Sequence, residues 1–156
     1  MAKKKFKHPR WISAVATLLT IADAYKTGLI DKPMARKTIN NILRCYGHYI
    51  QSSRIPDLVS RYAQGNPKLK TVREHAVPVK VVAEHILSMQ SADLNPTDEN
   101  INNLAIEIQD CIIVVRITKD EDACLSRLGL TEKMPKGWQW GDSYRARYDE
   151  AGIEIR

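Results

Sequence analysis

One stretch of this 156-residue chain indicates both its fold and its candidate site: Lys70-Thr71-Val72-Arg73-Glu74-His75-Ala76-Val77-Pro78-Val79. Its residues favour extended backbone, and Pro78 disfavours a helical conformation at Val77. The pattern therefore predicts a strand that ends near His75, with Glu74 and His75 pointing to opposite faces. A carboxylate next to a group that titrates near neutral pH is a combination used by metal-assisted hydrolases.

A second strand is predicted over Cys111–Ile117, the segment densest in β-branched residues. Thr118 ends this strand and, with Glu121 three residues later, forms the pattern of a capping box at the start of a helix. Gly129 is expected to end that helix. Residues 111–128 are therefore predicted to run from a buried strand directly into a capped helix.

Together these segments resemble the HNH (ββα-metal) nucleases. Glu74-His75-Ala76-Val77-Pro78 is similar to the first motif of that family, and the strand and helix of residues 111–128 are similar to its second half. The resemblance implies one Mg²⁺ or Mn²⁺ ion held by Glu74 and Asp122, with His75 as the general base on water. Glu121 is the alternative ligand to Asp122.

The chain departs from the family pattern in two places. The middle asparagine has no clear counterpart, although Asn103 lies in the intervening segment and is a candidate for a supporting role. The histidine pair of the last motif is absent. The resemblance covers roughly residues 70–130.

A second acid–histidine pair, Glu84 and His85, lies in a segment with helical spacing, Val79–Met89. Neighbouring residues on a helix point about 100° apart, so one member of the pair would face away from any shared site. His85 is therefore either a supporting group of the His75 site or a structural, hydrogen-bonded histidine, and the second interpretation is favoured.

The charge of the chain is divided unevenly. Residues 1–80 hold 16 Lys and Arg against 4 Asp and Glu, and residues 81–156 hold 8 against 14, giving net charges of +12 and −6. The excess of positive charge in residues 1–80 predicts a polyanionic partner, most simply nucleic acid. A basic surface that is only solvated would have the same excess of Lys and Arg. The residues expected to contact its backbone lie on a predicted helix or beside the acid–histidine pair: Arg36, Lys37, Arg44, Arg73 and Lys80.

The predicted fold class is α+β and mostly helical. A basic helical N-terminal region, residues 1–66, is expected to precede an HNH-like ββα unit with inserted helices, residues 67–156, which ends in a loop-like tail. The turn Gly65-Asn66-Pro67 marks the expected boundary. Helices are predicted over four further segments: Pro9 to before Gly28, Lys32 to about Tyr49 with Asp31 as its cap, Pro56–Ala63, and Thr97 to about Ile108.

The tail contains two tryptophans, Trp138 and Trp140, which either stack nucleic-acid bases or cover a core from outside. The covering role is favoured. Arg145 and Arg147 follow as possible phosphate clamps, and residues 153–155 as a short final strand.

Cysteine usage and the N-terminus bear on the compartment. Cys45, Cys111 and Cys124 are widely spaced and form no CxxC motif, which argues against a zinc finger and favours reduced thiols in the cytoplasm. The apolar run Trp11–Ala22 imitates a signal peptide, but polar residues interrupt it, its spacing is that of an amphipathic helix, and it is too short to span a membrane. A cytoplasmic protein without a membrane span is therefore expected.

The sequence thus predicts a metal-dependent endonuclease that hydrolyses phosphodiester bonds in nucleic acid, with DNA as the expected polymer. Two alternatives remain open. The first is a non-catalytic nucleic-acid-binding or regulatory protein, such as an inhibitor, which needs only the charge asymmetry. The second is a metal-free ribonuclease that uses His75 with Glu74 or His85 as acid and base.

Overall fold

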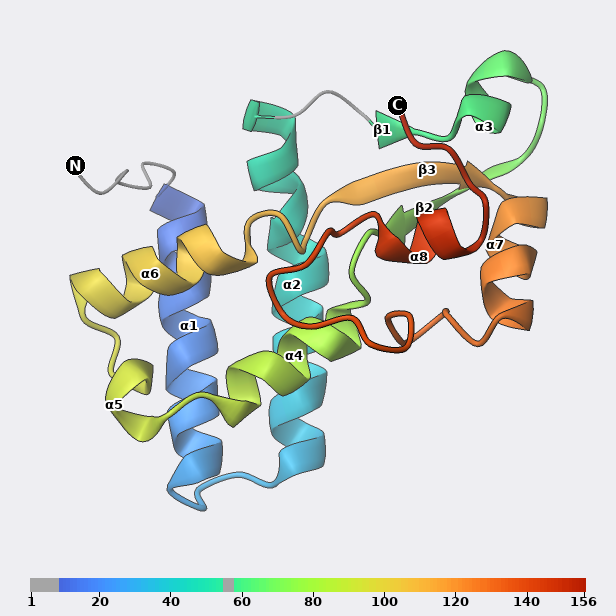
Figure 1. The fold of residues 1–156 in the computed structure, drawn as a ribbon. Coiled ribbons are helices and arrows are strands. Elements are labelled where there is room, and N and C mark those ends of the chain that lie inside the picture. The colour runs from blue at the N-terminus through green and yellow to red at the C-terminus, as the bar shows by residue number, and fades with distance from the viewer. Residues whose placement is uncertain (1–8, 55–57) are drawn as a thin grey trace.

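The computed structural model describes the backbone of residues 9–54 and 58–156, and the side chains of residues 9–45 and 58–156. The chain forms a group of helices beside a small three-stranded sheet that carries its own short helices (Figure 1). This is the α+β, mostly helical fold that the sequence predicts. None of the helices in the described part of the chain is both long enough and apolar enough to cross a membrane.

The first two helices are α1 (Pro9–Lys26) and α2 (Lys32–Arg54), and they pack against each other. Gly28, with a φ of 77°, makes the turn between them, and the amide of Met34 donates to Asp31 Oδ1 at 2.7 Å. Both the boundaries of α1 and the Asp31 cap agree with prediction, while α2 continues five residues past the expected end at Tyr49.

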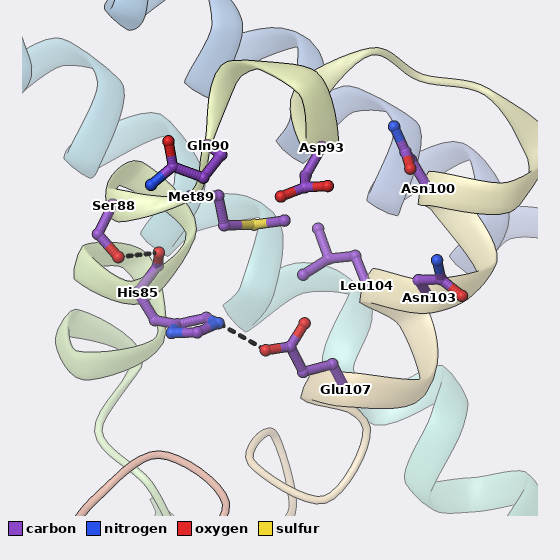
Figure 2. A pocket seen from close by; sticks show the side chains of 9 residues that line it. All are labelled: His85, Ser88, Met89, Gln90, Asp93, Asn100, Asn103, Leu104 and Glu107. Atoms are coloured by element: carbon purple, nitrogen blue, oxygen red, sulfur yellow. Dashed lines mark hydrogen bonds and ion pairs between the residues drawn. The ribbon is translucent and has the colours of Figure 1, made fainter.

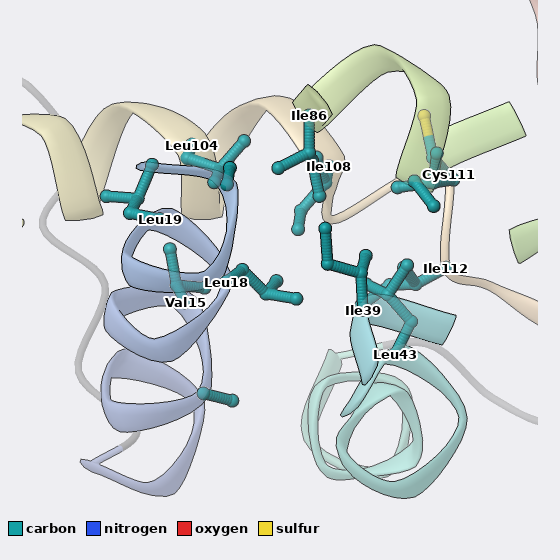
Figure 3. Close-up of a cluster of buried hydrophobic side chains, with 14 of the residues drawn as sticks. Val15, Leu18, Leu19, Ile39, Leu43, Ile86, Leu104, Ile108, Cys111 and Ile112 are labelled. Atoms are coloured by element: carbon teal, nitrogen blue, oxygen red, sulfur yellow. The ribbon is translucent and has the colours of Figure 1, made fainter. Parts of the chain in front are cut away.

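Three more helices complete the helical core: α4 (Val79–Ser88), α5 (Ser91–Leu94) and α6 (Asp98–Ile108). Thr97 caps α6 as predicted, since its hydroxyl accepts from the amide of Asn100. All five helices contribute buried apolar side chains to one cluster, which also includes residues 111 and 112 (Figure 3). The helices inserted between the two predicted strands therefore pack onto the N-terminal helices. The division at residues 66 and 67 stays a prediction.

The sheet has the order β1-β3-β2, with β1 at Leu58–Val59, β2 at Thr71–His75 and β3 at Val114–Thr118. β2 and β3 are antiparallel, so Glu74 lies opposite Val115 and His75 opposite Val114. The two strands predicted from the sequence are therefore direct neighbours in the sheet. The following helix, α7 (Lys119–Arg127), begins with the predicted capping box of Thr118 and Glu121 and contacts both strands.

Two element predictions were wrong. The segment expected to be a helix from Pro56 to Ala63 instead contains β1, and α3 (Arg61–Gly65) begins only after Ser60; residues 55–57 lie outside the described residues. Leu58 and Val59 are extended because they pair with β3 in parallel. The strand expected from Cys111 begins three residues later, because Cys111 and Ile112 still bond back to Ile108 and join the helical core.

The C-terminal tail is more ordered than predicted. It contains a short helix, α8 (Ala146–Glu150), and then runs along β1, where Val59 and Arg156 exchange backbone hydrogen bonds. The predicted final strand amounts to one bridge, between Ser60 and Ile155. Trp138 and Trp140 are partly buried against the helical core, which confirms their covering role.

Arg147, on α8, is completely buried and is not a phosphate clamp. Its guanidinium donates to the carbonyls of His75 and Ala76 at the end of β2, and to those of Leu130 and Thr131 after α7. The bonds to Ala76 and Leu130 measure 3.1 and 2.6 Å. One side chain thus joins α8, the end of β2 and the segment after α7.

Replacing Arg147 by Met should lower the free energy of unfolding by about 3 kcal/mol or more, because carbonyls that now accept charge-assisted bonds would be buried without a donor. Urea unfolding of both proteins measures this difference. Arg127→Met, at the exposed end of α7, is the matched control and should change stability by about 0.5 kcal/mol or less. Equal effects of the two substitutions would contradict the structural role given to Arg147.

Candidate functional site

Glu74 and His75 line a pocket of about 290 Å³ between α2, β2, the start of α4 and the segment after α7. We call it the basic pocket, because four of its lining residues are cationic. It is lined by Arg36, Asn40, Arg44, Arg73, Glu74, His75, Pro78, Val79, Lys80, Thr131 and Glu132. Four of the five residues predicted to contact nucleic acid are therefore brought together here, and Lys37 is not among them.

His75 is the last residue of β2, and its side chain is partly buried. Burial is the largest cause that lowers the pKa of the imidazole, and together with the positive charges of Arg44 and Arg147 it brings that pKa to about 4. Within the described residues no group hydrogen-bonds to the ring. His75 is therefore a neutral imidazole near pH 7 in a pocket lined by cations, and its ring nitrogens are not committed to another side chain.

Glu74 is largely buried, with 19% of its side chain exposed, and its Oε1 lies 3.5 Å from Nη2 of Arg147. Burial raises the pKa of Glu74, and this outweighs the opposing attraction of Arg147. The negative charge of Asp122 raises it further. Glu74 therefore acts in this structure as the counter-charge of the buried Arg147.

The two acids proposed from α7 have different surroundings. Asp122 is partly buried, and its electrostatic effect on Glu74 places it in the same region of the molecule. Glu121 is committed to the backbone cap: its Oε2 accepts from the amide of Thr118 at 2.7 Å and from the hydroxyl of Ser60, also at 2.7 Å. Glu121 therefore holds α3, β3 and α7 together.

A magnesium or manganese site needs several oxygen donors close together, which Glu74 and Asp122 would have to provide. Over residues 9–54 and 58–156, as far as their side chains are described, no three His, Cys, Asp or Glu side chains are grouped so that they could hold a metal ion. Glu74 and Asp122 are only two carboxylates, and Glu74 already faces Arg147. The residues in this arrangement do not complete the site, so the ion stays a prediction and we assign no reaction step to it.

Two of the cations at the basic pocket already have acidic neighbours. Glu84 lies 2.6 Å from Arg36 Nε and 2.8 Å from Lys32 Nζ, and its hydrogen bond with Lys32 is the main cause that lowers its pKa. Lys80 Nζ lies 2.8 Å from Glu132. Such partly exposed pairs contribute little to stability, so a phosphate that replaced the carboxylates would cost the fold little.

His85 does not reach the His75 site. Its Nε2 lies 2.7 Å from Oε1 of Glu107, and its ring stacks on Trp140 with the centroids 3.6 Å apart and an interplanar angle of 5°. His85 and Asn103 line a second pocket, shown in Figure 2, which shares no lining residue with the basic pocket. The supporting roles suggested for them at His75 therefore have no geometric basis here.

Sequence reasoning missed three lining residues of the basic pocket, Asn40, Thr131 and Glu132. Asn40 is on the polar side of α2, where the helical spacing of Arg36 and Arg44 points to it. Thr131 and Glu132 follow Gly129, and no local pattern indicates that this segment turns back toward β2.

The lowered pKa of His75 should appear in the pH dependence of stability. Between pH 4 and 6.5 the unfolded chain binds a proton at residue 75 that the folded chain does not, so the contribution of His75 to stability falls as the pH falls through this window. Urea unfolding at about pH 7 and about pH 5 should show a larger loss for the native protein than for His75→Gln. Equal losses would mean that the folded-state pKa of His75 is close to 6.5.

No family model, no curated protein and no solved structure matches this chain. The likeness to HNH nucleases therefore rests on the residues around Glu74–Pro78 and on the order of β2, β3 and α7. Membership of that family stays a prediction.

Proposed function

We propose that this protein binds the phosphodiester backbone of nucleic acid in the basic pocket. The observation that carries the proposal is the convergence of Arg36 and Arg44 from α2, Arg73 from β2 and Lys80 from α4 on one pocket. Phosphate groups are bound in proteins by such clusters, with arginine forming paired hydrogen bonds.

The other polar groups of the pocket are compatible with an anionic ligand. Glu74 faces Arg147, and Glu132 is exposed and can turn away from Lys80 into solvent. Asn40 Oδ1 is buried and has no hydrogen-bond partner among the described residues. Turning this amide by 180° presents Nδ2, a donor for a phosphate oxygen, at the same position.

Removing one cation from the basic pocket should weaken the binding of nucleic acid to the same extent whatever its base sequence. Arg44→Gln or Arg73→Gln should lower affinity for short labelled DNA and RNA and reduce the slope of log affinity against log salt by about 1 for each lost phosphate contact. Fluorescence anisotropy between about 50 and 200 mM salt measures both quantities.

Lys136→Gln is the matched control, since Lys136 is exposed in the C-terminal tail and does not line the pocket. Lys37→Gln tests whether the exposed face of α2 contributes outside the pocket. Affinity that does not respond to salt, or an equal effect of Arg44→Gln and Lys136→Gln, would refute binding at the basic pocket.

Hydrolysis of the bound phosphodiester is a second candidate function. Two observations favour it: the ββα order of β2, β3 and α7, and a buried, neutral histidine next to the cations. In such a reaction His75 would take a proton from water as its oxygen attacks phosphorus. The P–O bond to the leaving oxygen would break, and that oxygen would take a proton from solvent or from an acid in the pocket. Arg44 and Arg73 would stabilise the negative charge that develops.

The two forms of this second candidate differ in what assists His75. In the metal-dependent form, Glu74 would have to leave Arg147 and join Asp122 in holding Mg²⁺ or Mn²⁺. In the metal-free form, Glu74, whose pKa is raised, would be the acid, because His85 lines the other pocket. EDTA should abolish the first activity and spare the second.

If the protein cleaves nucleic acid, His75→Ala should lower the rate by about 10²–10⁴-fold, the usual contribution of a positioned proton-transfer group. Binding of uncleaved DNA should be nearly unchanged. His85→Ala, which removes a histidine that does not line the basic pocket, is the control and should retain the rate. Cleavage that survives in His75→Ala would exclude His75 as the base. If the native protein binds DNA but does not cleave it, only the proposed binding function would remain.

A further inference from the structure

The second pocket, which we call the His85 pocket, has a volume of about 420 Å³ and lies between the end of α4, α5 and α6. Its lining residues are His85, Ser88, Met89, Gln90, Asp93, Asn100, Asn103, Leu104 and Glu107. The volume falls within the range of small-molecule sites in proteins. Neither the nucleic-acid proposal nor the hydrolysis candidate uses this pocket.

The carboxylates of Asp93 and Glu107 face the pocket with Met89 and Leu104 between them (Figure 2). Glu107 Oε1 accepts from Trp140 Nε1 at 2.8 Å and is bonded to His85, so its position is fixed by two rings. In the described part of the chain nothing bonds to Glu107 Oε2 or to the Asp93 carboxylate. Two anionic acceptors are therefore available to a ligand.

The remaining lining limits what this ligand can be. Among the residues that the structure describes, no Lys or Arg lines the pocket, so a phosphate or carboxylate ligand would meet two negative charges without compensation from them. Met89 is partly buried and gives the pocket accessible apolar surface, whereas Leu104 is completely buried and offers a ligand no exposed surface. The thioether of methionine adapts its shape to apolar groups.

We propose that the His85 pocket binds a small organic cation, with an ammonium or guanidinium head on a short apolar body. The head would donate to Asp93 and to Glu107 Oε2, and the body would contact Met89. Asn103, on the rim and also without a hydrogen-bond partner within the described residues, would accept a further bond from the head group.

The glutamate also supplies a way to observe binding. Since Trp140 Nε1–H donates to Glu107, a cation that binds Glu107 Oε2 should change the chemical shift of that indole proton. The test uses n-butylguanidinium as the probe and n-butylurea as its neutral counterpart, titrated into the full-length protein at physiological ionic strength. Trp140→Phe identifies the indole signal among those of the three tryptophans.

Butylguanidinium should shift the Trp140 indole signal in a saturable manner, and butylurea should not. Asp93→Asn should weaken binding by about tenfold or more, as expected for the loss of one charge-assisted hydrogen bond. Glu107→Gln should weaken it similarly, while its amide oxygen still accepts from Trp140 and His85. The control is Asp98→Asn, which removes the same charge from the start of α6, outside the pocket.

Each variant must retain the cooperative unfolding of the native protein. Should Glu107→Gln fail to fold, Asp93→Asn alone tests the proposal. The Asp93 carboxylate makes no bond within the described part of the chain, so its replacement should not affect folding. The proposal is overturned if butylguanidinium shows no saturable binding, if butylurea binds equally well, or if Asp93→Asn and Asp98→Asn have the same effect.

Discussion

The buried guanidinium of Arg147 joins three segments that are distant in the sequence. Removing this charge from water is costly, and the hydrogen bonds to four carbonyl oxygens, together with the nearby Glu74 carboxylate, offset that cost. Two of these carbonyls belong to His75 and Ala76, where β2 ends. The orientation of the candidate site therefore depends on a side chain 72 residues further along the chain.

The same guanidinium contributes to the electrostatics of the site. Burial is the main cause that lowers the pKa of His75 and keeps the ring neutral, and the charges of Arg44 and then Arg147 add to it. A neutral ring suits a base or a hydrogen-bond partner of phosphate but not a cationic anchor. It also faces the Glu74 carboxylate that the HNH-like hypothesis assigns to a metal ion. A divalent cation and Arg147 would compete for one carboxylate, and a protein that used both would need Glu74 to change its partner. This competition is the physical reason for proposing backbone binding ahead of metal-dependent hydrolysis.

Local patterns predicted those parts of the fold that local interactions determine. The spacing of apolar residues in α1 and α4, the caps at Asp31 and Thr97, and the capping box of Thr118 and Glu121 all depend on residues within one or two turns. Tertiary contacts determined the rest. Leu58 and Val59 are a strand because β3 pairs with them, and Cys111 and Ile112 leave the strand because the helical core buries them. Arg147, in the sequence Arg-Ala-Arg, has the pattern of a surface residue, and only the carbonyls of other segments make its burial possible.

The two pockets lie at opposite ends of one ten-residue helix, α4. Its first residues, Val79 and Lys80, line the basic pocket, and His85 and Ser88 near its end line the other. In the middle of α4, Glu84 points to Arg36 and Lys32 of α2, and His85 points to Glu107 of α6. The helix therefore separates a pocket lined by cations from a pocket lined by carboxylates. Like charges would exclude the proposed ligand of each pocket from the other: Asp93 and Glu107 would repel phosphate, and Arg44 and Arg73 would repel an organic cation. The histidines of the two acid–histidine pairs, ten residues apart in the sequence, therefore lie in different pockets: His75 lies among cations, and His85 is bonded to the Glu107 carboxylate.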